Sequence, residues 1–159
     1  MDLDLYNRKI LDLAASIPRI GELEAPDVSV TARSRLCGSR ITVHLKFIDD
    51  RVADYAHEVH SCVIGKAVAS AVAQNIVDLP VAEIRAGAAA LRSLLKAKVL
   101  PTSAPWTVLE PFLPVSDLRA RHGSALLPFD ALERALDEVS DPRCGRDSLA
   151  VTFDQAIDT

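Results

Sequence analysis

The chain is 159 residues long, which is enough for one domain with a sizeable hydrophobic core. Apolar residues make up 49% of it and aromatic residues only 4%, so we expect a core of alanine, leucine, valine and isoleucine in closely packed helices. The net charge of −4 gives no overall basic footprint and argues against a nucleic-acid-binding protein.

The N-terminal sequence MDLDLYNRKI contains two acidic residues and no apolar segment of the kind found in signal peptides. The most hydrophobic helical stretch, AVASAVA, is far too short to span a bilayer. We therefore expect a soluble, cytoplasmic protein without membrane contact. In such a reducing compartment the odd number of cysteines, Cys37, Cys62 and Cys144, argues against a disulfide framework and leaves metal, redox and packing roles open.

Apolar residues at three- and four-residue steps predict an amphipathic helix over residues 3–17, which Pro18 ends. Three segments with alternating apolar residues follow, at 27–35, 41–47 and 52–60. Their short connections predict a small antiparallel three-stranded meander.

Alternation also assigns side chains of these strands to faces. In the second strand the apolar residues share one face, and His44 lies on the other. In the third strand Val52 shares a face with Asp54 and His60, while His57 lies on the opposite face. His57 and His60 therefore cannot both ligate one metal ion unless a bulge intervenes.

Helical spacing begins at Cys62 and predicts a helix with a stripe of small side chains. We expect Asp78 to cap the next helix, which ends near Lys98, and a short helix over 106–113. The last helix is expected to start close to Pro128 and to run through residue 139.

The order of helix, three strands and further helices predicts an α+β fold in which the meander packs against several helices. We assign residues 1–140 to this domain. Residues 141–159 are polar and aperiodic at first, and we expect them to form a C-terminal tail.

Two cysteines are predicted to lie at one end of the meander. Cys37 follows the first strand, and Gly38 after it suits a turn with an unusual φ. Cys62 lies where the third strand gives way to a helix, whose N-terminal dipole favours a thiolate. Strands of this length return to the same end of the sheet, so the two thiols could form half of a metal site or pack as small hydrophobes. His60 could come near this corner, and His122 lies in a loop that suits a ligand.

Three segments in this order, RLCGS, HSCVIGKAVASA and RHGSALLPFDAL, resemble the U-type iron–sulfur cluster assembly scaffolds, the IscU, NifU N-terminal and SufU group. The resemblance covers roughly residues 3–139. It implies an IscU/SufU-like fold, a transient iron–sulfur cluster or zinc, and no enzymatic activity of the chain itself. The partners it implies are a cysteine desulfurase and apo iron–sulfur acceptor proteins.

Residue by residue, the resemblance places Cys37 and Cys62 at the first two cysteine positions of the family. The family's aspartate falls on Ser39, and its third cysteine falls on Ser124. Serine is a poor ligand near neutral pH because its hydroxyl stays protonated. The resemblance thus implies a site for iron, an iron–sulfur cluster or zinc held by Cys37, Cys62 and His122.

Two other interpretations stay open. Two chains could each supply Cys37 and Cys62 to a bridged cluster, which would make the protein a homodimer. Alternatively, the fold could serve as a degenerate interaction or regulatory module without a functional metal site.

Overall fold

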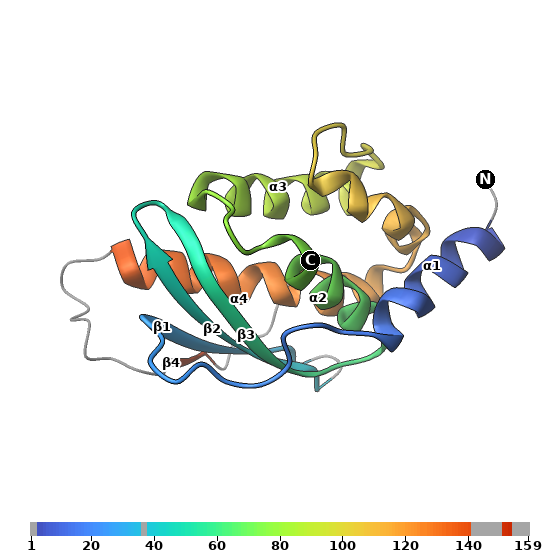
Figure 1. Ribbon diagram of the computed structural model, residues 1–159. Helices are drawn as coiled ribbons and strands as arrows, with labels where there is room; N and C mark the ends of the chain where they lie inside the picture. Colours follow the sequence, from blue (N-terminus) through green and yellow to red (C-terminus); the bar gives the residue numbers. More distant parts are fainter. Residues whose placement is uncertain (1–2, 36–37, 141–150, 154–159) are drawn as a thin grey trace.

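The structure of the chain is a computed structural model, which describes residues 3–35, 38–140 and 151–153. The predicted α+β fold is confirmed: an antiparallel meander packs against several helices (Figure 1). In chain order the elements are α1 (Leu3–Ala15), β1 (Val28–Arg33), β2 (Arg40–Ile48), β3 (Arg51–His60), α2 (Val63–Asn75), α3 (Val81–Ala97), the 3-10 helices η1 (Trp106–Asp117) and η2 (Arg119–Arg121), α4 (His122–Ser140) and β4 (Val151–Phe153).

The sheet contains one strand more than the sequence predicts. Its strand order is β3-β2-β1-β4, with antiparallel pairing within the meander and parallel pairing between β1 and β4. Strand β4 belongs to the segment 141–159, of which the structure describes only residues 151–153. These three residues extend the sheet at its β1 edge.

A β-bulge changes the face of one residue in β3. Lys46 pairs with Asp54 and Phe47 pairs with Val52, so β3 carries one extra residue at this point. The extra residue reverses the alternation beyond it, and Val52 is 0% exposed while Asp54 is exposed. The prediction that Val52 and Asp54 share a face is wrong for this reason.

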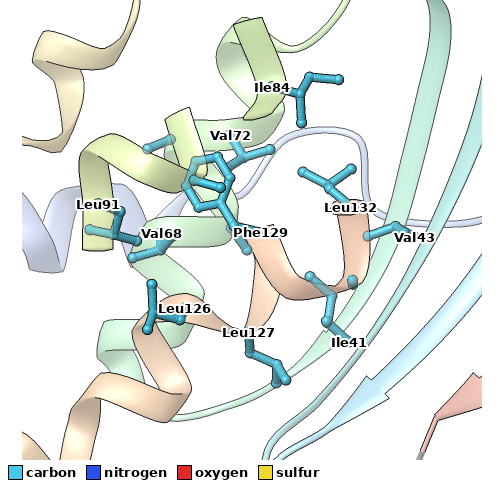
Figure 2. Packing of buried hydrophobic residues seen from close by; sticks show 14 of the residues in the cluster. Ile41, Val43, Val68, Val72, Ile84, Leu91, Leu126, Leu127, Phe129 and Leu132 are labelled. Atoms are coloured by element: carbon cyan, nitrogen blue, oxygen red, sulfur yellow. The ribbon is translucent and has the colours of Figure 1, made fainter. Parts of the chain in front are cut away.

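Helix α4 forms the middle layer of the domain. It packs against β1 and β2 on one side and against α2 and α3 on the other (Figure 1). Figure 2 shows the ring of Phe129 beside Val72 of α2 and Leu91 of α3, while Leu132 of the same helix lies toward Val43 of β2. All five side chains are fully buried. Among the described helices, none is both long and apolar enough to cross a membrane.

Helix α4 begins at His122, well before the predicted start at Pro128. Pro128 lies inside the helix, where it lacks the N–H for a helical hydrogen bond. The helix continues past it because the residues on both sides, from Ser124 to Leu132, are almost all buried against the sheet and α2. His122 and Ser124 therefore lie in the first turn of a helix, and the prediction that His122 lies in a loop is wrong.

The predicted cap of α3 is also wrong, because the residue before the helix is Pro80 rather than Asp78. Asp78 has a φ of 71°, and its N–H donates to the carbonyl of Val52 at 2.8 Å. Its own carbonyl accepts a hydrogen bond from Nη1 of Arg51 at 2.8 Å. Asp78 thus ties the α2–α3 connection to the start of β3.

Candidate metal centre

A hollow of about 350 Å³ lies at the end of the sheet where β3 gives way to α2. The residues that line it come from the turn before β2 and from the β3–α2 junction: Gly38, Ser39, Val59, His60, Ser61, Cys62 and Lys66. We call it the Cys62 hollow. Gly38 and Ser39, which follow Cys37 in the sequence, therefore share one hollow with Cys62. Cys37 itself and Cys144 lie outside the described residues.

Backbone hydrogen bonds close the turn that leads into the hollow. The N–H of Ser34 donates to the carbonyl of Ser39 at 2.8 Å, and the N–H of Gly38 donates to the carbonyl of Ser34 at 3.0 Å. Gly38 has a φ of 69°, in the left-handed region that glycine adopts without strain. At the base of the turn Arg33 pairs with Arg40 across β1 and β2. Strand pairing and these bonds together fix the position of Ser39.

Cys62 is the residue that precedes α2, and its thiol is half-buried. Burial raises the pKa of the Cys62 thiol, but hydrogen bonds from the N–H groups of Gly65 and Ile64 and from the hydroxyls of Ser124 and Ser61 outweigh it. The pKa of this thiol therefore lies below its ordinary value. These donors favour the thiolate, which is the form that binds soft metals.

Three serine hydroxyls form a connected cluster beside the thiol. The hydroxyl of Ser61 donates to Oγ of Ser39 at 3.1 Å, and Oγ of Ser39 lies 3.5 Å from Oγ of Ser124. Ser39 is 3% exposed and Ser124 is 1% exposed. Positions 39 and 124, far apart in the sequence, therefore meet beside Cys62. Sequence reasoning missed Ser61, although its place directly before the cysteine was a signal.

Gly65 allows α2 to approach this cluster. A Cβ atom at this position would lie 1.9 Å from Oγ of Ser61 and 3.1 Å from the carbonyl oxygen of Ser124. Such distances exclude a side chain unless the neighbours move. Gly65 therefore sets the close contact between the starts of α2 and α4.

The two histidines named as candidates near the site differ in accessibility. His60 is exposed and lines the hollow. His122 is 5% exposed and is not among the residues that line it. Nε2 of His122 lies 3.0 Å and 3.1 Å from the carbonyl oxygens of Val115 and Ser116, so this nitrogen must be a donor. Only Nδ1 is then left to bind a metal, and the ligand role of His122 stays a prediction.

The remaining histidines lie in the sheet. Nε2 of His57 donates to the carbonyl of Pro18 at 2.9 Å, and burial lowers the pKa of this imidazole. Nδ1 of His44 lies 2.7 Å from Oγ of Ser29, and its Nε2 lies 3.5 Å from a carboxylate oxygen of Glu58. Within the described ranges no group of three His, Cys, Asp or Glu side chains could hold a metal ion.

Sequence comparison relates the chain to cluster-assembly proteins. Residues 5–99 match the NifU-like N terminal domain. The iron–sulfur cluster assembly scaffold protein IscU of Thermotoga maritima is 36% identical over 80 residues, which are 50% of this chain and 56% of that protein. The chain thus spans just over half the length of this relative.

Solved structures have the same fold. The N-terminal part of a nitrogen-fixing NifU-like protein from Brucella abortus is 40% identical, with a TM-score of 0.81 over 84% of this chain and 93% of that one. A putative iron–sulfur cluster assembly scaffold protein for the SUF system from Fervidobacterium islandicum is 21% identical, with a TM-score of 0.76 over 86% of this chain and 99% of that one. The second likeness concerns the fold alone.

Proposed function

Because the chain belongs to the family of NifU-like N-terminal domains, the U-type iron–sulfur cluster assembly scaffolds, we propose that it carries iron, an iron–sulfur cluster or zinc at the Cys62 hollow. Cys37 and Cys62 are the proposed ligands. The observation that carries the proposal is the thiol of Cys62, which is half-buried in an open hollow and surrounded by donors that favour the thiolate.

The donor set of the hollow fits a soft metal. Thiolates bind iron and zinc well, and imidazole suits both metals. His60 offers its imidazole from the lining of the hollow. His122 could contribute only through Nδ1, since its Nε2 is engaged by two carbonyls.

Ser39 and Ser124 distinguish this site from the ligand pattern that the resemblance implies. Their hydroxyls belong to the cluster around Cys62 and act as hydrogen-bonding groups there. A cargo bound to two thiolates has fewer protein ligands than one bound to three thiolates and a carboxylate. We therefore expect the cargo to be held loosely and passed on readily.

The proposed partners follow from this role. A cysteine desulfurase would supply sulfur, and apo iron–sulfur proteins would receive the cluster. We assign the chain no reaction of its own, because the residues of the hollow bind and release a cargo. A second copy of the chain could supply two further thiolates to a bridged cluster in a homodimer.

The second candidate function is an interaction or regulatory module without a metal site. It is favoured by one observation: serines occupy two family ligand positions, and both are almost fully buried.

Metal and sulfide analysis of the whole chain, purified without oxygen or chelator, separates the two functions. Near-stoichiometric zinc, or iron with a thiolate-to-iron absorption band, is the result we expect. A folded protein that stays colourless and metal-free after iron and sulfide are supplied would leave only the interaction module.

A further inference from the structure

Three basic side chains lie in one row across the sheet beside the Cys62 hollow. Arg33 of β1 pairs with Arg40 of β2, and Arg40 pairs with His60 of β3. Residues opposite each other in a ladder point to the same face of a sheet. Their strand neighbours Ala32 and Ile41 are buried on the helix side, so the row lies on the outer face. Lys66 of α2 lines the hollow together with His60. We call these four residues the basic row.

The arginine and lysine charges of the basic row are not compensated within the described residues. None of its four side chains has an ion pair or hydrogen bond there. Glu58, two residues before His60 in β3 and paired with Thr42, instead contacts His44. Basic residues elsewhere do pair with carboxylates: Arg19, Arg85, Arg92 and Lys98. Some basic residues elsewhere, among them Lys46 and Lys96, are likewise without an ion pair in the described part of the chain, so what distinguishes this corner is that four basic side chains gather there, in a chain whose net charge is −4.

The opposite end of the sheet carries several acidic side chains. The turn between β2 and β3, at the far end of the hairpin in Figure 1, contains Asp49 and Asp50, both exposed. Asp54 follows on β3, with a single arginine partner at 3.6 Å. Lys46, opposite Asp54, and Arg51, next to Asp50, lie at this end as well, so the two ends of the sheet differ only partly in charge, with the basic excess at the Cys62 hollow. Such a distribution orients an approaching charged partner.

We propose that the basic row docks a carboxylate-rich segment of a partner protein and so aligns that partner with the Cys62 hollow. Neighbouring strands lie about 4.8 Å apart, so three strands spread the row over about 10 Å. This span exceeds a single carboxylate and matches several acidic side chains on one segment. A nucleic acid fits less well, because its phosphates continue along the backbone beyond a row of this length, whereas a few carboxylates on a short segment stay within it. The role of docking, to align a partner with a metal or cluster in the hollow, rests on the proposed function. Binding of the acidic segment itself needs no bound metal.

The experiment titrates the metal-free whole chain into a fluorescently labelled ten-residue peptide of aspartate and glutamate and follows anisotropy. Exposed charges act over about 10 Å at 0.1 M salt, so we expect binding to weaken as salt is raised. Replacing both Arg33 and Arg40 by glutamate should weaken binding about tenfold or more. The milder Arg33→Gln and Arg40→Gln variants should each weaken it less, and they serve if the double variant fails to fold.

Two controls keep the result specific. Lys96→Glu makes the same change of charge as Arg40→Glu alone, at an exposed position on α3, and should bind the peptide like the wild type while Arg40→Glu does not. Cys62→Ala should also bind like the wild type, so that loss of metal and loss of docking are seen separately.

Equal weakening by Lys96→Glu would overturn the proposal, because attraction would then follow net charge. Equal binding of an uncharged peptide of the same length would overturn it as well. Tighter binding of a single-stranded DNA oligonucleotide, lost in the arginine variants, would overturn the assignment of a protein partner.

Discussion

The Cys62 hollow and the pocket of carbonyls around His122 both contact the first turn of α4. They differ in how the polar groups around them are hydrogen-bonded. Ser124, in the first turn of α4, directs its hydroxyl to the thiol of Cys62, which lines the hollow together with His60. His122, two residues earlier, is buried and donates to the last carbonyls of η1. One site is open to a ligand from outside, and the other is closed by the protein itself.

Packing thus decides which candidate side chain is available to a ligand from outside. Carbonyls at the end of a helix have no partner in the next turn and need donors from elsewhere. Helix η1 is a 3-10 helix with Pro111 and Pro114 inside it, and it ends against α4. The N–H of Leu118 donates to the carbonyl of Val115, and His122 adds a donor to the carbonyls of Val115 and Ser116. Its position in the sequence fits a ligand, but its surroundings fit a helix cap.

The largest effect that we expect separates Cys62 from Cys144. Cys62→Ala should abolish retention of metal, and Cys37→Ala should do the same, because each removes half of the thiolate pair. Cys144→Ala is the matched control and should retain the wild-type amount. Metal analysis after anaerobic purification measures all three, and equal metal in the three variants would contradict the ligand assignment.

The next largest expected effect is a gain in metal retention. Ser124→Cys places a third thiol against Cys62, and we expect loss of metal to a chelator to slow about tenfold or more, since thiolates bind soft metals strongly. Ser124→Ala is the control and should bring no gain. If Ser124→Cys releases metal as fast as the wild type, then position 124 does not face the bound metal.

His122→Ala should lower the stability of the fold. The carbonyl of Val115 keeps a hydrogen bond from the N–H of Leu118 at 2.9 Å, but the buried imidazole donor to Ser116 is lost, so we expect the free energy of unfolding to fall by about 1–3 kcal/mol. Urea unfolding measures this change. Metal content per folded chain should match the wild type.

His60→Ala is the matched variant in the open site and should leave the urea midpoint unchanged, because His60 is exposed. It should instead weaken metal retention. Loss of metal from a folded His122→Ala protein would instead bear out the sequence prediction that His122 is a ligand, through its Nδ1.

The smallest effect concerns the reactivity of the thiol. The hydroxyl of Ser124 lowers the pKa of Cys62 by donating to its sulfur, so Ser124→Ala should raise that pKa. At pH 7 the thiolate fraction then falls, and alkylation should slow about twofold or more. Iodoacetamide kinetics from pH 5 to 9, on a metal-free background lacking Cys37 and Cys144, measure the shift.

Ser116→Ala removes a hydroxyl from the closed site beside His122 and is the control for this experiment. It should leave the alkylation profile of Cys62 unchanged. An unshifted profile for Ser124→Ala would mean that its hydroxyl does not contact the thiol.

Much of the fold could be predicted from periodicity. The meander and the helix that follows Cys62 have clear two- and 3.6-residue patterns, and their order specifies the α+β class. The start of α4 could not be predicted, because Pro128 is typical of a helix start and the burial that carries the helix past it is tertiary. The bulge that turns Val52 inward and the three residues of β4 leave no periodic signal either.

Part of the candidate site could be predicted as well. Strand length places Cys62 and the turn after Cys37 at one end of the sheet, and the resemblance singles out Ser39 and Ser124. The hydrogen-bond partners of His122 depend on where η1 ends, which the sequence does not specify. The basic row depends on strand register, which aligns Arg33, Arg40 and His60 only once the sheet has formed.

The most direct test of the central claim is the X-ray absorption spectrum of the zinc-loaded protein at the zinc K-edge. Zinc–sulfur bonds are about 2.3 Å long and zinc–nitrogen or zinc–oxygen bonds about 2.0–2.1 Å, so the two kinds of ligand are resolved. We expect two sulfur ligands in the wild type and one in each of Cys37→Ala and Cys62→Ala. A first shell of nitrogen and oxygen alone, or one unchanged by both substitutions, would contradict the assignment of the Cys62 hollow as the metal site.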